Sequence, residues 1–85
     1  MNLIPSLRFT RDLQKLEKNN QPLKKAIGKT MSRLQDDPNH PSLRLHKLSG
    51  LSAYSISVTM RVRMIIAFRG DDIHLLRIGT HEDVY

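Results

Sequence analysis

The spacing of apolar residues changes once along this 85-residue chain, and that change limits the folds that the chain can adopt. From residue 11 to a proline-rich connection at residues 39–42, apolar side chains recur every three to four residues, which is typical of amphipathic helices. After it they alternate with other side chains, which is typical of strands with one buried face. The sequence therefore predicts helices followed by a sheet, an α+β arrangement.

The part before the connection predicts one strand and two helices. Residues 3–9 alternate and are expected to form a short edge strand. A short helix is expected over residues 11–18, with Thr10 as its N-cap. A second helix carries Pro22 in its first turn and is expected to end at Asp37, which precedes another proline. The inward positions of this helix follow a regular helical period and are Leu23, Ala26, Ile27, Thr30, Met31 and Leu34.

Four strands are expected after the connection, at residues 45–48, 54–58, 61–68 and 73–78. The predicted order is β-α-α-β-β-β-β, a single domain over residues 1–85 with both N-terminal helices packed on one face of a small antiparallel sheet. The helices are expected to cover the face that carries Val62, Met64 and Ile66. Arg61 and Arg63 then project together from the open face, because strand side chains alternate.

The net charge of +6 comes entirely from the first part of the chain. Residues 1–50 carry ten basic and four acidic side chains, whereas residues 51–85 carry four of each. On the second predicted helix, Lys25, Lys29 and Arg33 form a stripe at intervals of four residues. The excess predicts a polyanionic partner, which can be RNA, DNA, a ribosome or an acidic protein.

Several kinds of chemistry are excluded by the composition. There is no cysteine, so disulfides, thiolate zinc sites and cysteine nucleophiles cannot form. No serine lies in a G-x-S-x-G elbow, no glycine-rich phosphate loop is present, and the histidines do not have metal-ligand spacing. We therefore expect no metal and no cofactor. No apolar run approaches the roughly 20 residues of a membrane span and no signal peptide is evident, so a cytoplasmic location without membrane contact is expected.

The remaining candidates are cations and imidazoles of the sheet. Arg63 can hold a phosphate through two hydrogen bonds, or it can be a solvated surface charge. His81 follows the end of the last strand and titrates near neutrality, so it can serve as a general acid or base, or be an ordinary exposed residue. His46 is open to the same two interpretations.

Four segments of the second half resemble one protein family. They are His-x-Leu-x-Gly at residues 46–50, Tyr-Ser-Ile-Ser-Val at 54–58, Arg-Met-Ile-Ile-Ala-Phe at 63–68, and Leu-Leu-Arg-Ile-Gly-Thr-His-Glu-Asp-Val-Tyr at 75–85. Together they are similar to the RelE/ParE superfamily of bacterial toxins, and within it to the YafQ/YoeB-like mRNA interferases. The predicted element order is similar to that family's fold, so the resemblance covers essentially the whole chain.

The resemblance implies a toxin of a type II toxin–antitoxin system that cleaves mRNA on the ribosome and is restrained by a cognate antitoxin. It implies that His81 and His46 are the acid–base pair and that Arg63 stabilises the scissile phosphate. Tyr85 is implied to stack on a base, and Lys47, Arg61 and Arg77 are implied to bind the substrate. The stripe of Lys25, Lys29 and Arg33 is expected to dock on ribosomal RNA.

The sequence departs from the family pattern at one place. Active members often carry a carboxylate near the hairpin, but no acid lies between Gly50 and Gly70. Two alternatives therefore stay open beside the ribonuclease: a non-enzymatic gyrase inhibitor like the ParE toxins, and a weakly active relative kept for binding an antitoxin or nucleic acid.

Overall fold

The computed structural model describes residues 1–50 and 52–84, and it contains the predicted strand, two helices and four strands in that order. The elements are β1 (Asn2–Pro5), α1 (Leu7–Glu17), α2 (Gln21–Asp36), the 3-10 turn η1 (Pro41–Leu43), β2 (His46–Lys47), β3 (Tyr54–Ser57), β4 (Val62–Arg69), β5 (Asp72–Thr80) and α3 (His81–Val84). The short elements η1 and α3 are additions to the predicted order. In the described part of the chain, no helix is long and apolar enough to cross a membrane.

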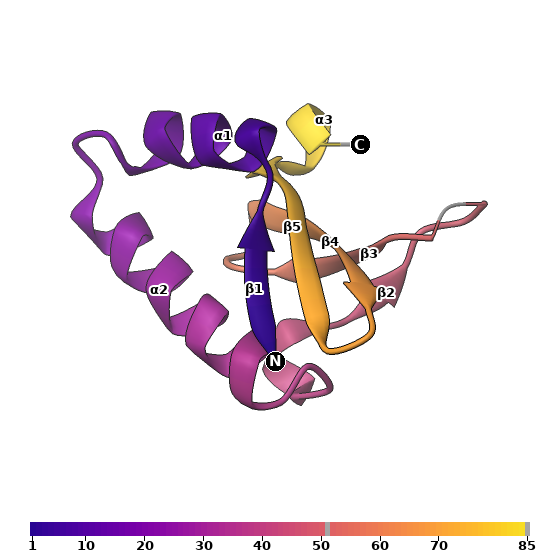
Figure 1. The fold of residues 1–85 in the computed structure, drawn as a ribbon. Coiled ribbons are helices and arrows are strands. Elements are labelled where there is room, and N and C mark those ends of the chain that lie inside the picture. Colours follow the sequence, from indigo (N-terminus) through magenta and orange to yellow (C-terminus); the bar gives the residue numbers. More distant parts are fainter. Residues whose placement is uncertain (51, 85) are drawn as a thin grey trace.

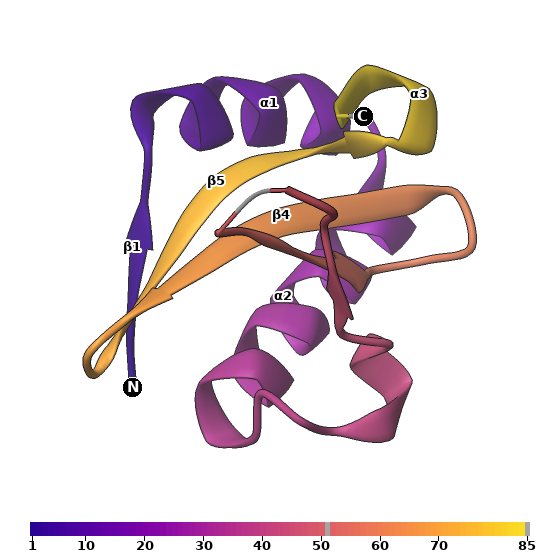
Figure 2. The same cartoon turned by 90° about the vertical axis from the view of Figure 1, so that its right-hand side faces the viewer.

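The described strands form one five-stranded sheet in the order β1-β5-β4-β3-β2. Strands β2 to β5 pair antiparallel as predicted, but β1 pairs parallel with β5, so the sheet is mixed and the prediction of an antiparallel sheet is wrong for this strand. Asn2 faces Asp72 across this pair, and the two strands lie side by side in Figures 1 and 2. Their relative direction depends on the path of the chain through both helices, which no local pattern records.

Helix α1 begins at Leu7, earlier than predicted, and its N-cap is Ser6 rather than the predicted threonine. The Ser6 hydroxyl accepts a hydrogen bond from the backbone N–H of Phe9 at 2.9 Å and donates one to the carbonyl of Leu76 at 2.9 Å. One side chain thus caps the helix and ties its first turn to β5. Phe9 and Leu7 do not alternate on a strand: Phe9 is buried on the helix, and Leu7 is 68% exposed.

Helix α2 agrees with its prediction because both of its ends are set by nearby residues. The Asn20 side chain accepts a hydrogen bond from the backbone N–H of Leu23 at 3.1 Å and so caps the start of the helix. The helix ends before Asp37, which is followed by proline. Its buried residues are Ile27, Thr30 and Leu34.

The core lies between the helices and one face of the sheet. Phe9 of α1 and two buried residues of α2, Ile27 and Leu34, belong to one hydrophobic cluster. Val62, Met64 and Ile66 of β4 are in the same cluster, which confirms the predicted inward face of that strand. Figure 1 shows α1 running across one end of the sheet and α2 running along its side. The opposite face of the sheet is left open by the helices, and it carries the candidate site.

Candidate functional site

The register of the sheet gathers several predicted residues on the open face. His46, Ser55, Ile65 and Arg77 are successive cross-strand partners from β2 to β5. Partners on neighbouring strands project to the same face of a sheet. These four residues therefore share the face opposite to Met64, which is fully buried in the core.

Arg63 lies on the same face, two residues before Ile65, and its cross-strand partners are Ser57 and Gly79. Its Nη1 atom is buried and has no hydrogen-bond acceptor among the described residues. Burying a charged donor without an acceptor is unfavourable by about 1–3 kcal/mol or more. Arg63 as a whole is half-buried, and its planar guanidinium suits two-point binding of a phosphate. The surroundings of Arg63 are therefore suited to an anionic ligand.

A hollow of about 580 Å³ opens on this face. Its lining combines apolar side chains with two arginines and a histidine, and includes Ile65, Ala67, Leu76, Arg69, His74 and Arg77. An apolar floor with cations beside it suits a ligand that has both flat apolar surface and negative charge, as a nucleotide does.

The two candidate histidines lie on different elements, separated by β3 and β4 in the order of the sheet. His46 is exposed on β2, the edge strand, and His81 is exposed at the start of α3, directly after β5. Val84 of α3 lines the hollow, so this short helix belongs to the same side of the molecule. If both imidazoles reach a bound RNA strand, one can act on it as a base and the other as an acid.

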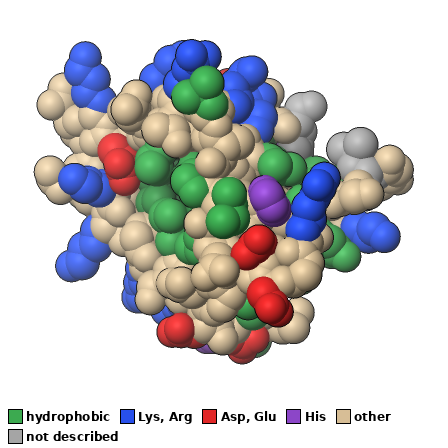
Figure 3. Space-filling model, in the orientation of Figure 1, with side chains coloured by type: hydrophobic (Ala, Val, Ile, Leu, Met, Phe, Trp, Pro, Cys, Tyr) green, Lys and Arg blue, Asp and Glu red, His purple; other side chains and the backbone are tan. Residues whose placement is uncertain are grey.

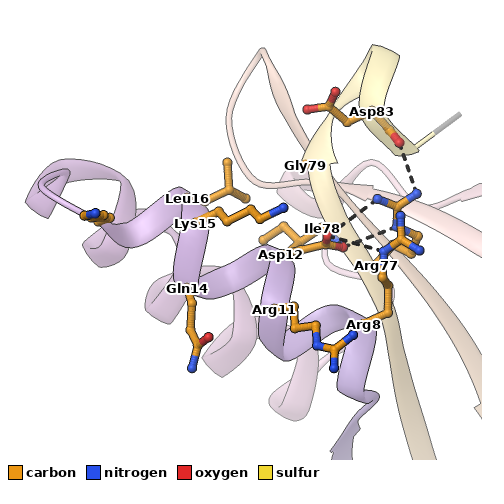
Figure 4. Close-up of a pocket in the computed structure, with 11 residues that line it drawn as sticks. Arg8, Arg11, Asp12, Gln14, Lys15, Leu16, Arg77, Ile78, Gly79 and Asp83 are labelled. Atoms are coloured by element: carbon orange, nitrogen blue, oxygen red, sulfur yellow. Dashed lines mark hydrogen bonds and ion pairs between the residues drawn. The ribbon is translucent and has the colours of Figure 1, made fainter.

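Arg77 is held by protein groups on two sides, as Figure 4 shows. Its Nε donates to Asp12 Oδ2 at 3.2 Å and its Nη2 lies 3.5 Å from Asp12 Oδ1. Its Nη1 donates to the backbone carbonyl of Asp83 at 3.1 Å. The residue predicted to contact substrate is thus also a link between α1, β5 and α3.

A second hollow, of about 860 Å³, lies between α1 and the end of β5. Arg77 lines both hollows. The basic side chains that α1 and its C-cap contribute are Arg8, Arg11, Lys15 and Lys18, and Figure 3 shows lysine and arginine side chains gathered over this helix. Sequence reasoning placed Asp12 only as an acid in the first turn of the helix, and it gave neither Asp12 nor these four cations a role in the site. The available signal was an acid at position 12 with Arg8, Arg11 and Lys15 close to it on the same helix.

Arg61 is not part of β4, because that strand begins at Val62. It lies in the turn between β3 and β4, where Thr59 Oγ1 accepts hydrogen bonds from the backbone N–H groups of Arg61 and Val62. The strand alternation expected to align Arg61 with Arg63 does not extend to it, so that prediction is wrong.

The other predicted binding residues are placed as follows. Strand alternation directs Lys47 to the face opposite to that of His46. The stripe on α2 is present, with Lys25 and Lys29 exposed, whereas Arg33 is half-buried and its Nη1 donates to Ser42 Oγ at 3.2 Å. The predicted base-stacking residue Tyr85 lies outside the described residues. Within residues 1–50 and 52–84, no three His, Cys, Asp or Glu side chains come together as a metal site requires.

Known proteins provide comparisons at the level of structure. No protein-family model matches the sequence, and no curated protein matches it. Solved structures do match over nearly the whole chain. A metal-bound toxin from Helicobacter pylori has 23% identity and a TM-score of 0.83, covering 100% of this chain and 99% of its own.

Two further matches come from other bacteria. A chain of the E. coli DinJ-YafQ toxin–antitoxin complex has 17% identity and a TM-score of 0.83, covering 99% of this chain and 96% of its own. The YoeB/ParE toxin from Agrobacterium tumefaciens has 15% identity and a TM-score of 0.80, covering 95% and 99%. The protein therefore has the fold of these bacterial toxins, the RelE-like fold that the sequence resemblance predicts.

Proposed function

We propose that this protein is the toxin of a type II toxin–antitoxin module and stops translation by cleaving mRNA on the ribosome. The shared toxin fold supports the first part of this proposal. The second part depends most on Arg63, whose buried Nη1 has no acceptor among the described residues on a face that also carries His46 and is flanked by His81. Such a cation is suited to a phosphate, and the imidazoles are suited to moving protons around it.

The proposed reaction is attack of a ribose 2′-hydroxyl on the adjacent phosphate. One imidazole removes the proton of the 2′-OH as the new O–P bond forms, and the other protonates the 5′-oxygen as its bond to phosphorus breaks. Arg63 and Arg77 balance the negative charge that grows on the phosphate oxygens. The products are a 2′,3′-cyclic phosphate and a 5′-OH, and DNA is not a substrate because it lacks the nucleophile. This scheme assigns every proton transfer to a side chain, so it requires no metal.

The proposed partners follow from charge and from the comparison with the DinJ-YafQ complex. A cognate antitoxin is expected to bind this basic protein and restrain it. Ribosomal RNA is expected to contact the α2 stripe of Lys25, Lys29 and Arg33, through charge attraction that added salt weakens. This activity places the protein in the bacterial cytoplasm, where ribosomes translate mRNA.

One observation favours a second candidate, a non-enzymatic toxin that inhibits gyrase. The hairpin region carries no carboxylate between Gly50 and Gly70 to serve as a base. A supercoiling assay with purified gyrase separates the two candidates, because the ribonuclease leaves supercoiling unchanged and the alternative abolishes it.

The deciding experiment compares mRNA cleavage on translating ribosomes by the wild type, Arg63→Ala, His81→Ala and Lys24→Ala. Loss of a positioned acid or base lowers a rate by about 10²–10⁴-fold, and loss of one charge-stabilising donor by about 10²–10³-fold. Lys24 is an exposed lysine of α2 outside both hollows, so its removal controls for the loss of one positive charge. Equal cleavage by all four proteins would refute the site, and no cleavage by the wild type would refute the activity.

A further inference from the structure

The outer edge of β5 is covered by two different elements. β1 pairs with β5 only as far as Pro5, which faces Leu75. Beyond that point the backbone N–H of Ser6 donates to the carbonyl of Leu75 at 2.9 Å, and Asp12 Oδ2 accepts the backbone N–H of Ile78 at 3.2 Å. Asp12 of helix α1 and the N-cap Ser6 therefore supply hydrogen bonds to the part of the β5 edge that β1 does not cover.

The same carboxylate holds Arg77. The two carboxylate oxygens of Asp12 lie near Nε and Nη2, so Asp12 contacts one edge of the guanidinium at two points. This two-point geometry makes arginine–carboxylate pairs strong. The Asp12 side chain is 13% exposed and that of Arg77 is 30% exposed, so water weakens this pair less than it weakens a surface pair. The other cation near Asp12 is Arg8, at 3.8 Å and 64% exposed, which makes it a weak partner.

The far side of the guanidinium is tied to α3. Nη1 of Arg77 donates to the Asp83 carbonyl, and α3 packs so closely on Gly79 that a Cβ there would lie 3.1 Å from Val84 Cγ1. A guanidinium carries five N–H groups, and the contacts with Asp12 and Asp83 use three of them. Two N–H groups are left over from these contacts for a substrate phosphate.

We propose that Asp12 is a positioning residue: it fixes the Arg77 guanidinium between the two hollows and, through Arg77, sets the place of α3, which begins with His81. This inference rests on the proposed function and adds to it the residue that organises one side of the site. A free arginine side chain has about 2 kcal/mol of rotamer entropy to lose when it binds. Asp12 removes most of that loss before substrate arrives, because Arg77 is already ordered.

The test compares single-turnover mRNA cleavage on ribosomes by Asp12→Asn, Arg77→Ala and the double variant, with Arg8→Ala as the matched control. In Asp12→Asn the side-chain oxygen at the Oδ2 position can still accept both the Ile78 N–H and the Arg77 Nε–H, while the NH2 group at the Oδ1 position meets Arg77 Nη2 donor to donor and the negative charge is lost. This change therefore removes the charge of the ion pair and the contact with Nη2 while the strand edge stays covered. We expect both single variants to lose on the order of 10- to 100-fold in rate, and the double variant to be no slower than Arg77→Ala. The Arg8→Ala rate should stay within twofold of wild type.

A second readout does not depend on activity. In two-dimensional NMR spectra, Asp12→Asn and Arg77→Ala should shift the same backbone amides of residues 81–84, and Arg8→Ala should leave them in place. Three results would overturn the positioning role. The first is a wild-type cleavage rate in Asp12→Asn, and the second is a double variant whose loss in rate equals the product of the two single losses. The third is that the chemical shifts of the α3 backbone amides change in neither single variant. If the wild type does not cleave mRNA at all, the proposed function fails, and the NMR comparison alone decides the role of Asp12.

Discussion

Helix α3 packs directly against Gly79 of β5. A Cβ at this position would lie 3.1 Å from Val84 Cγ1 and 3.2 Å from Asp83 Cβ, closer than side chains normally approach. The short helix therefore packs tightly on β5 at a residue that has no side chain. That contact places Val84 in the lining of the hollow and His81 beside it in sequence.

We predict that Gly79→Ala displaces α3, lowers the unfolding free energy by about 1–3 kcal/mol through overpacking and slows mRNA cleavage. Gly28→Ala is the matched control, since a Cβ there meets nothing within 4 Å on the exposed side of α2. It should stabilise the protein by about 0.5–1 kcal/mol, because alanine favours a helix interior over glycine. Urea unfolding and cleavage rates measure both effects. Equal stability and activity in the two variants would contradict the role of Gly79.

The candidate site could be predicted from the sequence only in part, and the reason lies in individual residues. His46, Arg63 and His81 stand in short motifs or alternating strands, where local spacing carries information. Asp12 does not, because its partners Arg77 and Ile78 are 65 and 66 residues away. Its role depends on α1 crossing the end of β5, and no pattern around residue 12 encodes that crossing.

At the scale of elements, α2 and the β4–β5 hairpin were predictable because their ends are set locally. Asn20 caps α2, and Gly70 adopts the positive φ of 58° that the turn between the strands requires. The boundary between β1 and α1 was not predictable in the same way. It depends on Ser6, whose hydroxyl donates a hydrogen bond to the carbonyl of Leu76 in β5, and on the parallel pairing of β1 with a strand about 70 residues later.

We predict that Ser6→Ala destabilises the protein by about 1–3 kcal/mol, because it removes the cap of α1 and the bond to the Leu76 carbonyl together. Thr10→Ala is the control. Its hydroxyl donates to the Ser6 carbonyl at an exposed position, so its loss should change stability by less than about 0.5 kcal/mol. Urea denaturation measures both values. A Ser6→Ala midpoint equal to that of Thr10→Ala would show that β1, not this serine, fixes the start of α1.

At the scale of the whole molecule, charge and chemistry occupy different parts of the chain. The net charge of +6 belongs to residues 1–50, which form β1, both long helices and β2, whereas the electroneutral remainder forms most of the sheet. On this account the helical layer attracts an anionic partner, and the open sheet face holds the phosphate that reacts.

We predict that Lys25→Ala combined with Lys29→Ala weakens ribosome binding and makes it less sensitive to salt. Each lost phosphate contact should lower the slope of log affinity against log salt by roughly 0.7–0.9. Lys24→Ala removes a neighbouring charge of α2 outside the stripe and should leave the slope nearly unchanged. Binding titrations at several salt concentrations give the slopes. If the double variant keeps the wild-type slope, the stripe is not the docking surface.

The central claim is that the open face of the sheet cleaves RNA through the 2′-hydroxyl, with Arg63 on the phosphate. The most direct measurement is single-turnover cleavage of ribosome-bound mRNA that carries either ribose or 2′-deoxyribose at one mapped site. We predict that the wild type cleaves the ribose form to a 2′,3′-cyclic phosphate and leaves the deoxy form intact, and that Arg63→Ala is slower on the ribose form by about 10²–10³-fold. Cleavage of the deoxy form, or an unchanged rate in Arg63→Ala, would contradict the account.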